Sequence, residues 1–169
     1  KNILSKRNFI YSPSLRDKTT AAITSKAAPF QALADLSTFV GREAEQDALR
    51  DALLRPRRIA LTSLLGMGGV GKTTLATRLA YELRDHFPDG VLWARLDTSD
   101  IMSLLNMLAG AYGVDVTRYQ TIDSRSAIVR GLLADKRALL ILDNAESSAQ
   151  VIPLLPPTTG SCTVLLTTR

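Results

Sequence analysis

The chain has 169 residues, of which 46% are hydrophobic and 22% are charged, a composition typical of a soluble globular domain. No apolar run reaches the roughly 18 residues that span a membrane, and the single cysteine, Cys162, excludes an internal disulfide framework. The net charge of +5 arises in residues 1–28, which carry six basic side chains and one acid, so the rest of the chain is neutral. We therefore expect a cytoplasmic protein whose folded body has no membrane partner and no nucleic-acid partner.

Residues 1–36 show little periodic hydrophobicity and many Ser, Thr, Lys and Ala residues. They are interpreted as a basic, partly disordered linker, with a phosphate- or membrane-contacting arm as the alternative. Residues 37–169 are interpreted as one domain. Because the chain begins at Lys1 rather than at methionine and stops within an expected strand, we expect it to be part of a longer protein.

Helices and strands alternate through the domain. The hydrophobic pattern predicts, in chain order, a helix over 43–54, a strand over 59–65, a helix over 71–86, a strand over 91–96, helices over 101–112 and 124–135, a strand over 138–142, a short helix over 147–152 and a strand over 163–167. The stretch ALLIL at 138–142 is apolar without alternation, as in a parallel strand covered on both faces. The pattern predicts an α/β fold with a mainly parallel sheet.

The stretch GMGGVGKT, residues 66–73, fits the phosphate-loop pattern G-x-x-x-x-G-K-[ST] between an expected strand and an expected helix. Glycines permit positive φ and a close approach of backbone N–H groups to phosphate oxygens, while the helix N-terminus adds partial positive charge. We expect Lys72 to reach the β- and γ-phosphates, Thr73 to ligate Mg²⁺ and Thr74 to lie beside the α-phosphate. The predicted phosphate-binding residues are Gly66, Gly68, Gly69, Val70, Gly71, Lys72, Thr73 and Thr74.

A second acidic position follows from the strand ALLILD, which ends in Asp143. Ligands bind beyond the carboxyl ends of strands in open α/β sheets. An acid there can hold Mg²⁺ and position the attacking water. Asp143 is therefore predicted to act on the metal side of the site, with a helix-capping role as the alternative.

With these motifs in place, the chain resembles the nucleotide-binding part of an NB-ARC domain, in the STAND class of signalling P-loop ATPases. The resemblance is carried by FVGRE at 39–43, GMGGVGKTTLA at 66–76, ALLILD at 138–143 and TVLLTTR at 163–169. It implies a three-layer P-loop NTPase fold, truncated before the fifth strand and the helical and winged-helix subdomains, with the last strand between the other two motif strands. It also implies that Val40 and Arg42 lie beside adenine and ribose, and that Arg169 faces the γ-phosphate as a catalytic group with Lys72 and Asp143.

The resemblance implies an ATP/ADP-binding regulatory switch in which slow, Mg²⁺-dependent hydrolysis gates self-association of the full-length protein, together with effector and sensor domains outside this chain. One departure bears on hydrolysis. Many family members have a second acid after the strand aspartate, whereas this chain has Asn144, which can orient water but accepts no proton at neutral pH. Glu146 is a possible substitute, although a surface position at a helix start is favoured.

A non-catalytic interaction module with structural ADP is the alternative function. The Ala-, Leu- and Arg-rich composition favours a bacterial origin.

Other chemistries find less support in the sequence. A GTPase needs an N-K-x-D or T-K-x-D segment, which does not occur, and chromosome-partitioning ATPases need a lysine where this chain has Met67. A DNA motor would carry a basic face, and a small-molecule kinase would carry an arginine-rich lid. One histidine and one cysteine cannot form a usual structural zinc site.

Overall fold

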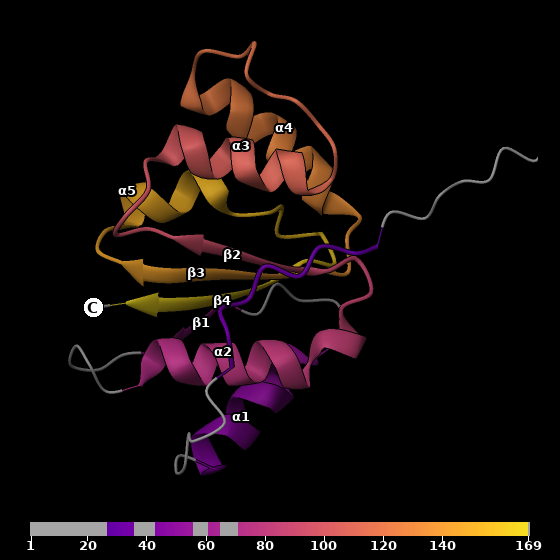
Figure 1. The fold of residues 1–169 in the computed structure, drawn as a ribbon, viewed down its shortest axis with the longest axis vertical. Coiled ribbons are helices and arrows are strands. Elements are labelled where there is room, and N and C mark those ends of the chain that lie inside the picture. The colour runs from indigo at the N-terminus through magenta and orange to yellow at the C-terminus, as the bar shows by residue number, and fades with distance from the viewer. Residues whose placement is uncertain (1–26, 36–42, 56–60, 65–70, 169) are drawn as a thin grey trace, which may run out of the picture.

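A computed structural model describes residues 27–35, 43–55, 61–64 and 71–168 (Figure 1). Helices and strands alternate along the described chain, apart from the paired helices α3 and α4. In order they are α1 (Glu43–Leu53), β1 (Leu61–Leu64), α2 (Lys72–Glu82), the 3₁₀ turn η1 (Arg84–His86), β2 (Val91–Arg95), α3 (Ile101–Ala111), α4 (Ile122–Ala134), β3 (Leu139–Ala145), α5 (Ser148–Val151), the 3₁₀ turn η2 (Ile152–Leu154) and β4 (Thr163–Thr168).

The described strands form one four-stranded sheet in the order β1-β4-β3-β2, and every neighbouring pair is parallel. This confirms the predicted α/β class and the predicted place of the last strand between β1 and β3. Because all the strands run the same way, their carboxyl ends meet at one edge of the sheet. The residues that follow β2 and β3 and the start of α2 therefore gather there.

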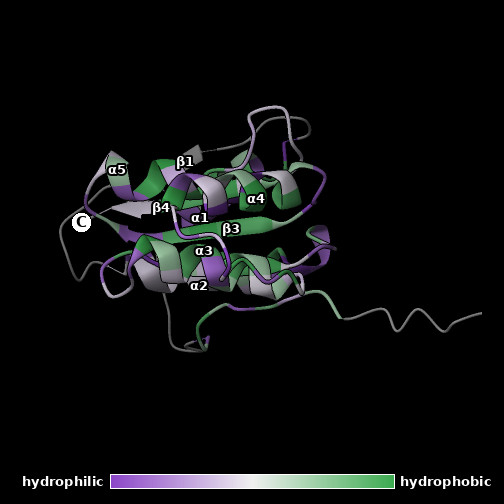
Figure 2. Cartoon of the chain, turned by 90° about the horizontal axis from the view of Figure 1, so that it is seen from above, coloured by the Kyte–Doolittle hydropathy of each residue, from purple (hydrophilic) through white to green (hydrophobic). Residues whose placement is uncertain are grey.

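The sheet is the middle of three layers (Figure 1). Helices α1 and α2 cover one face, and α3, α4 and α5 cover the other. The sequence of β3 is apolar without alternation because both of its faces are covered: Leu139 and Ile141 pack with α2, and Leu140 and Leu142 pack with α3 and α4. In Figure 2, most of β3 has the colour of hydrophobic residues.

The main differences from the sequence prediction lie at the ends of α2, α4 and β3. Helix α2 stops at Glu82 and η1 follows, instead of one helix to residue 86. Helix α4 begins two residues earlier than predicted because the Thr121 side chain accepts a hydrogen bond from the Ser124 N–H at its N-terminus. Strand β3 extends to Ala145, with an irregular register between Leu142 and Ala145. Asp143 and the following residue consequently lie inside the strand rather than beyond it.

Residues 27–35, here called the edge segment, pair with the outer side of β2. The Val91 N–H donates to the Pro29 carbonyl at 2.8 Å, and the Gln31 N–H donates to the Val91 carbonyl at 2.9 Å. Gly90 has φ 116°, and a Cβ at that position would lie 2.5 Å from the Pro29 oxygen, so only glycine fits there. These residues fall within the region 1–36 that was interpreted as a linker, because a single β-bridge leaves no periodic pattern in the sequence.

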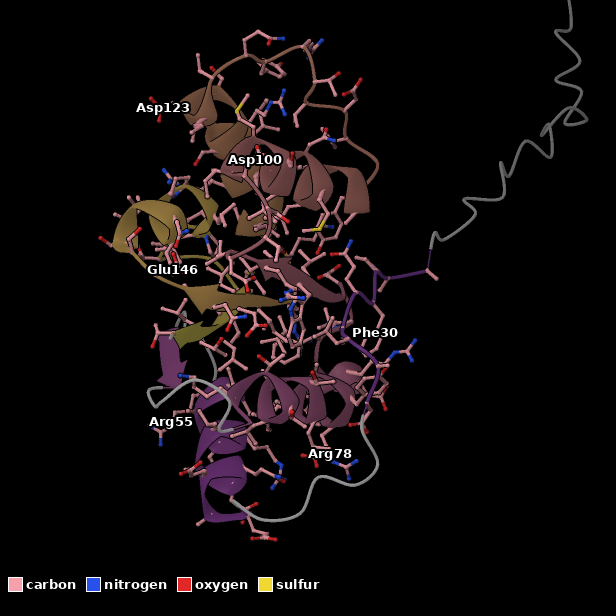
Figure 3. All side chains as sticks on the ribbon, turned by 60° about the vertical axis from the view of Figure 1, so that its left-hand side comes forward. Phe30, Arg55, Arg78, Asp100, Asp123 and Glu146 are labelled. Carbon is pink, nitrogen blue, oxygen red and sulfur yellow. The ribbon has the colours of Figure 1, made fainter. Side chains whose placement is uncertain are left out.

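The edge segment also contacts the carboxyl half of α2. The Phe30 ring meets the Tyr81 ring edge-on at 5.0 Å between centroids, and the Arg84 guanidinium lies 4.6 Å from the Phe30 centroid. Further along, Arg78 forms an ion pair with Asp35 at 3.1 Å. Figure 3 shows Phe30 and Arg78 on the side of the molecule where this segment runs. The segment is thus attached both to β2 and to the helix that follows the phosphate-loop motif.

Candidate functional site

The structure describes five of the residues that the sequence assigns to a nucleotide site: Gly71, Lys72, Thr73, Thr74 and Asp143. The others lie outside the described residues; they are Val40, Arg42, Gly66, Gly68, Gly69, Val70 and Arg169. The described part of the site therefore consists of the start of α2 and the carboxyl ends of β2, β3 and β4.

Helix α2 begins with a left-handed residue. Gly71 occupies the N-cap position with φ 77°, which a glycine adopts without steric cost, and its carbonyl accepts the Leu75 N–H at 2.8 Å. No acidic side chain lies in the first turn. The partial positive charge of the helix N-terminus is consequently not balanced by a carboxylate of its own first turn, as suits a helix end that receives an anion. Lys72, with 6% of its surface exposed, is the first helical residue.

A threonine of α2 and the aspartate of β3 meet at this end of the sheet. The Thr73 Oγ1 lies 3.1 Å from Asp143 Oδ1 and 3.2 Å from Asp143 Oδ2, so its hydroxyl donates to the carboxylate. The two residues are 70 positions apart in sequence. Asp143 is fully buried, and Thr77 Oγ1 donates to the Thr73 carbonyl at 2.8 Å, which fixes the first turn of the helix.

Thr167 of β4 is a further partner of Asp143. Its hydroxyl donates to Asp143 Oδ1 at 2.5 Å and accepts the Asn144 N–H at 2.9 Å. Like Asp143, Thr167 is fully buried. The buried carboxylate is thus held by hydroxyls from α2 and β4, as a buried charge requires. Thr167 was not among the site residues predicted from the sequence, although its position beside Asp143 follows once β4 is placed next to β3.

The paired oxygens fit a magnesium ion. Mg²⁺ prefers hard oxygen ligands and is commonly held by one or two protein groups together with waters and substrate phosphates. Thr73 Oγ1 and the Asp143 carboxylate supply such oxygens side by side. Within the described residues, no group of three or more His, Cys, Asp or Glu side chains could hold a metal alone. The donor set therefore suits an ion shared with phosphates rather than an all-protein metal cage.

The residue after Asp143 has an unusual backbone. Asn144 has φ 61°, a left-handed conformation that asparagine tolerates better than most side chains. Its side-chain Nδ2 donates to Asp97 Oδ2 at 3.2 Å, and Arg95 donates to the same oxygen at 3.3 Å. Asp97, which follows β2, was also missed in the sequence, although an acid just beyond a buried strand is the same signal that selected Asp143.

Glu146, the other acid considered in the sequence, lies elsewhere. Its side chain is exposed, and its N–H donates to Gln150 Oε1 at 3.0 Å at the start of α5 (Figure 3). With residues of α5 and β4 it lines a mainly apolar groove of about 670 Å³ that includes Val151, Ile152 and Leu166. Neither Thr73 nor Asp143 lines that groove, so Glu146 belongs to a different surface from the paired oxygens.

Comparison with known proteins identifies one matching family. Residues 42–169 match the NB-ARC domain. The chain is 39% identical over 149 residues to the regulatory protein AfsR of Streptomyces griseus, which covers 83% of this chain and 15% of that protein. It is 37% identical over 164 residues to AfsR of Streptomyces coelicolor, covering 89% of this chain and 16% of that protein.

A plant protein is also similar. The probable disease resistance protein RF45 of Arabidopsis thaliana is 31% identical over 144 residues, covering 80% of this chain and 14% of that protein. The chain therefore spans about a sixth or less of the length of these relatives. None of the helices in the described part of the chain has the length and apolar character needed to cross a membrane.

Proposed function

The chain belongs to the NB-ARC domain family, and from that premise we propose that it binds ATP and ADP with Mg²⁺ where α2 begins beside β3. Membership of this family makes it a nucleotide-binding signalling domain. The observation that carries the proposal is the contact between Thr73 Oγ1 and the Asp143 carboxylate beside the N-terminus of α2. Such a site combines an anion-binding helix end with hard metal ligands.

Each residue has a distinct part in this proposal. Backbone N–H groups of Gly66, Gly68, Gly69, Val70 and Gly71 surround the phosphates, and the Lys72 ammonium binds the β- and γ-phosphates. Thr73 and Asp143 hold Mg²⁺, which neutralises charge on the phosphates when bound. Thr74 binds near the α-phosphate. Val40 and Arg42 contact adenine and ribose, and Arg169 distinguishes a triphosphate from a diphosphate because only the former presents the extra charge.

The nucleotide serves as a switch in a longer, cytoplasmic protein. ADP favours a closed form, and ATP favours an open form that self-associates, with slow hydrolysis restoring the first. Effector and sensor domains outside this chain receive and send the signal; the relatives named as a regulatory protein and as a probable disease resistance protein support such a role. Moving a two-state balance from 1:99 to 99:1 requires about 5.5 kcal/mol of differential binding. Arg169 and Mg²⁺ supply part of that difference, and contacts beyond this chain supply the rest.

A calorimetric titration tests the proposal. The protein is titrated with Mg-ADP, Mg-ATP and Mg-GTP, and the Lys72→Ala variant serves as the control for the phosphate site. We expect binding that is selective for adenine nucleotides and lost in the variant. A folded protein that binds no nucleotide, or that binds all three equally with and without Lys72, would contradict the proposal. If the protein binds ADP tightly but ATP does not promote its self-association, the alternative function, an interaction module with structural ADP, is favoured.

A further inference from the structure

The pairing of β3 with β4 is interrupted beside Asp143. The register shifts between Leu142 and Ala145, so that Asp143 and the residue after it lie opposite a single residue of β4, Thr167. Such a bulge disrupts the regular hydrogen bonding between two strands and re-aims side chains, and bulges are over-represented next to functional sites. The contacts of Thr167 therefore decide how the chain is held on both sides of the Asp143 carboxylate.

The side chain of Thr167 bridges the interruption. Its hydroxyl accepts the Asn144 N–H at 2.9 Å and donates to Asp143 Oδ1 at 2.5 Å. A hydroxyl group is both a donor and an acceptor, so one small side chain satisfies both contacts. Because Thr167 is fully buried, it fixes the backbone that follows Asp143 and the direction of the carboxylate at the same time.

The hydroxyls that hold Asp143 are neutral groups. Thr73 Oγ1 lies 3.1 Å from Oδ1 and 3.2 Å from Oδ2, whereas Thr167 donates to Oδ1 at the shorter distance of 2.5 Å. A neutral donor leaves the negative charge of the carboxylate available to a cation, whereas a lysine or arginine partner would offset it. Thr167 thus orients the carboxylate and preserves its charge.

From these contacts we infer that Thr167 is a positioning residue for the metal side of the nucleotide site. Its hydroxyl holds the Asp143 carboxylate in the orientation that binds Mg²⁺ together with Thr73. This inference rests on the proposed nucleotide site and adds a residue of β4 to it. Groups that orient a metal ligand without touching the metal commonly contribute about 10- to 100-fold to metal affinity.

The inference separates two parts of nucleotide binding. The Lys72 ammonium and the N-terminus of α2 are proposed to bind phosphates directly, without Thr167. Thr73 and Asp143 are proposed to act through Mg²⁺. Loss of the Thr167 hydroxyl should therefore weaken only the part of the binding that depends on Mg²⁺.

The experiment measures how much Mg²⁺ strengthens binding. The dissociation constant of the non-hydrolysable β,γ-imido analogue of ATP is determined by calorimetry in excess Mg²⁺ and in excess EDTA, and the ratio of the two values is the Mg²⁺ enhancement. Thr167→Val removes the hydroxyl and keeps the shape, whereas Thr167→Ser keeps the hydroxyl. Thr168→Val is the matched control, because Thr168 Oγ1 is buried without a hydrogen-bond partner among the described residues.

Urea unfolding checks that each variant is folded under the conditions of the titration. If Thr167→Val is unfolded, Thr167→Cys takes its place, because a thiol is only a weak donor and a weak acceptor. We expect Thr167→Val, or Thr167→Cys, to lower the Mg²⁺ enhancement about 10-fold, with affinity in EDTA changed less than about twofold. Thr167→Ser and Thr168→Val should keep the wild-type enhancement.

Four results overturn the inference. They are an unchanged enhancement in folded Thr167→Val, an equal loss of affinity with and without Mg²⁺, a loss in Thr167→Ser or Thr168→Val as large as in Thr167→Val, and a wild-type protein whose binding of the analogue does not depend on Mg²⁺. A wild-type protein that does not bind the analogue under either condition instead contradicts the proposed nucleotide site, so the two failures are distinguishable.

Discussion

Replacing Thr167 with valine should destabilise the protein through the network around Asp143. Valine keeps the shape of threonine but removes a hydroxyl that donates to Asp143 Oδ1 and accepts the Asn144 N–H. A lost hydrogen bond to a charged group costs about 1.5–3 kcal/mol, and a buried N–H left without a partner costs about 1–3 kcal/mol. Because Thr73 still donates to Asp143, we expect a net loss of about 3 kcal/mol in the free energy of unfolding.

The adjacent threonine provides a matched control. Thr168 Oγ1 is buried and has no hydrogen-bond partner among the described residues, so Thr168→Val removes a hydroxyl that gains nothing from burial. Urea unfolding at 25 °C measures both variants. With a slope of about 2 kcal/mol/M, Thr167→Val should lower the midpoint by about 1.5 M, while Thr168→Val should leave it unchanged or raise it. Equal midpoints for the two variants would refute the assignment of Thr167 as a partner of the buried carboxylate.

Two further changes test other parts of the fold. Phe30→Ala removes the contacts of the edge segment with Tyr81 and Arg84, and should lower the free energy of unfolding by about 2 kcal/mol, measured in urea; no loss would mean that the segment does not stabilise the domain. Burial raises the pKa of the Cys162 thiol from 9.0 to about 12, so the folded state retains a proton that the unfolded state loses, and stability declines as pH rises above 9. Between pH 8 and pH 10 the wild type should lose about 1.4 kcal/mol more than Cys162→Ala, and parallel pH profiles would contradict this.

Local patterns were sufficient to predict the parallel sheet, whereas the place of its last strand was implied by the resemblance to the NB-ARC family. The unalternating ALLIL stretch indicated a strand covered on both faces, and Leu139 to Leu142 do pack alternately against the two helical layers. The contact of Thr73 with Asp143 was implied by two motifs that each mark the carboxyl edge of a parallel sheet. These features depend on the hydrophobic periodicity of short segments and on the residues that end helices and strands, and a single sequence contains both.

Features that depend on tertiary pairing were not predicted. Asp97 reaches Asn144 only because β2 and β3 pair in one register, and that register is fixed by the packed sheet rather than by either strand alone. The attachment of Phe30 likewise depends on one backbone bridge to Val91 and on the space left by Gly90. The extension of β3 through Asp143 and Asn144 escaped notice because polar residues after an apolar run usually mark the end of a strand.

The central claim is that α2 and β3 together hold the phosphates of an adenine nucleotide. The most direct measurement is the urea midpoint of the wild type and of Lys72→Ala, each with and without Mg-ADP. A ligand that binds only the folded state at 100 times its dissociation constant stabilises it by about 2.7 kcal/mol. We predict that stabilisation for the wild type at such a concentration and almost none for Lys72→Ala at the same concentration. Equal stabilisation of both proteins, or none of either, would contradict the claim.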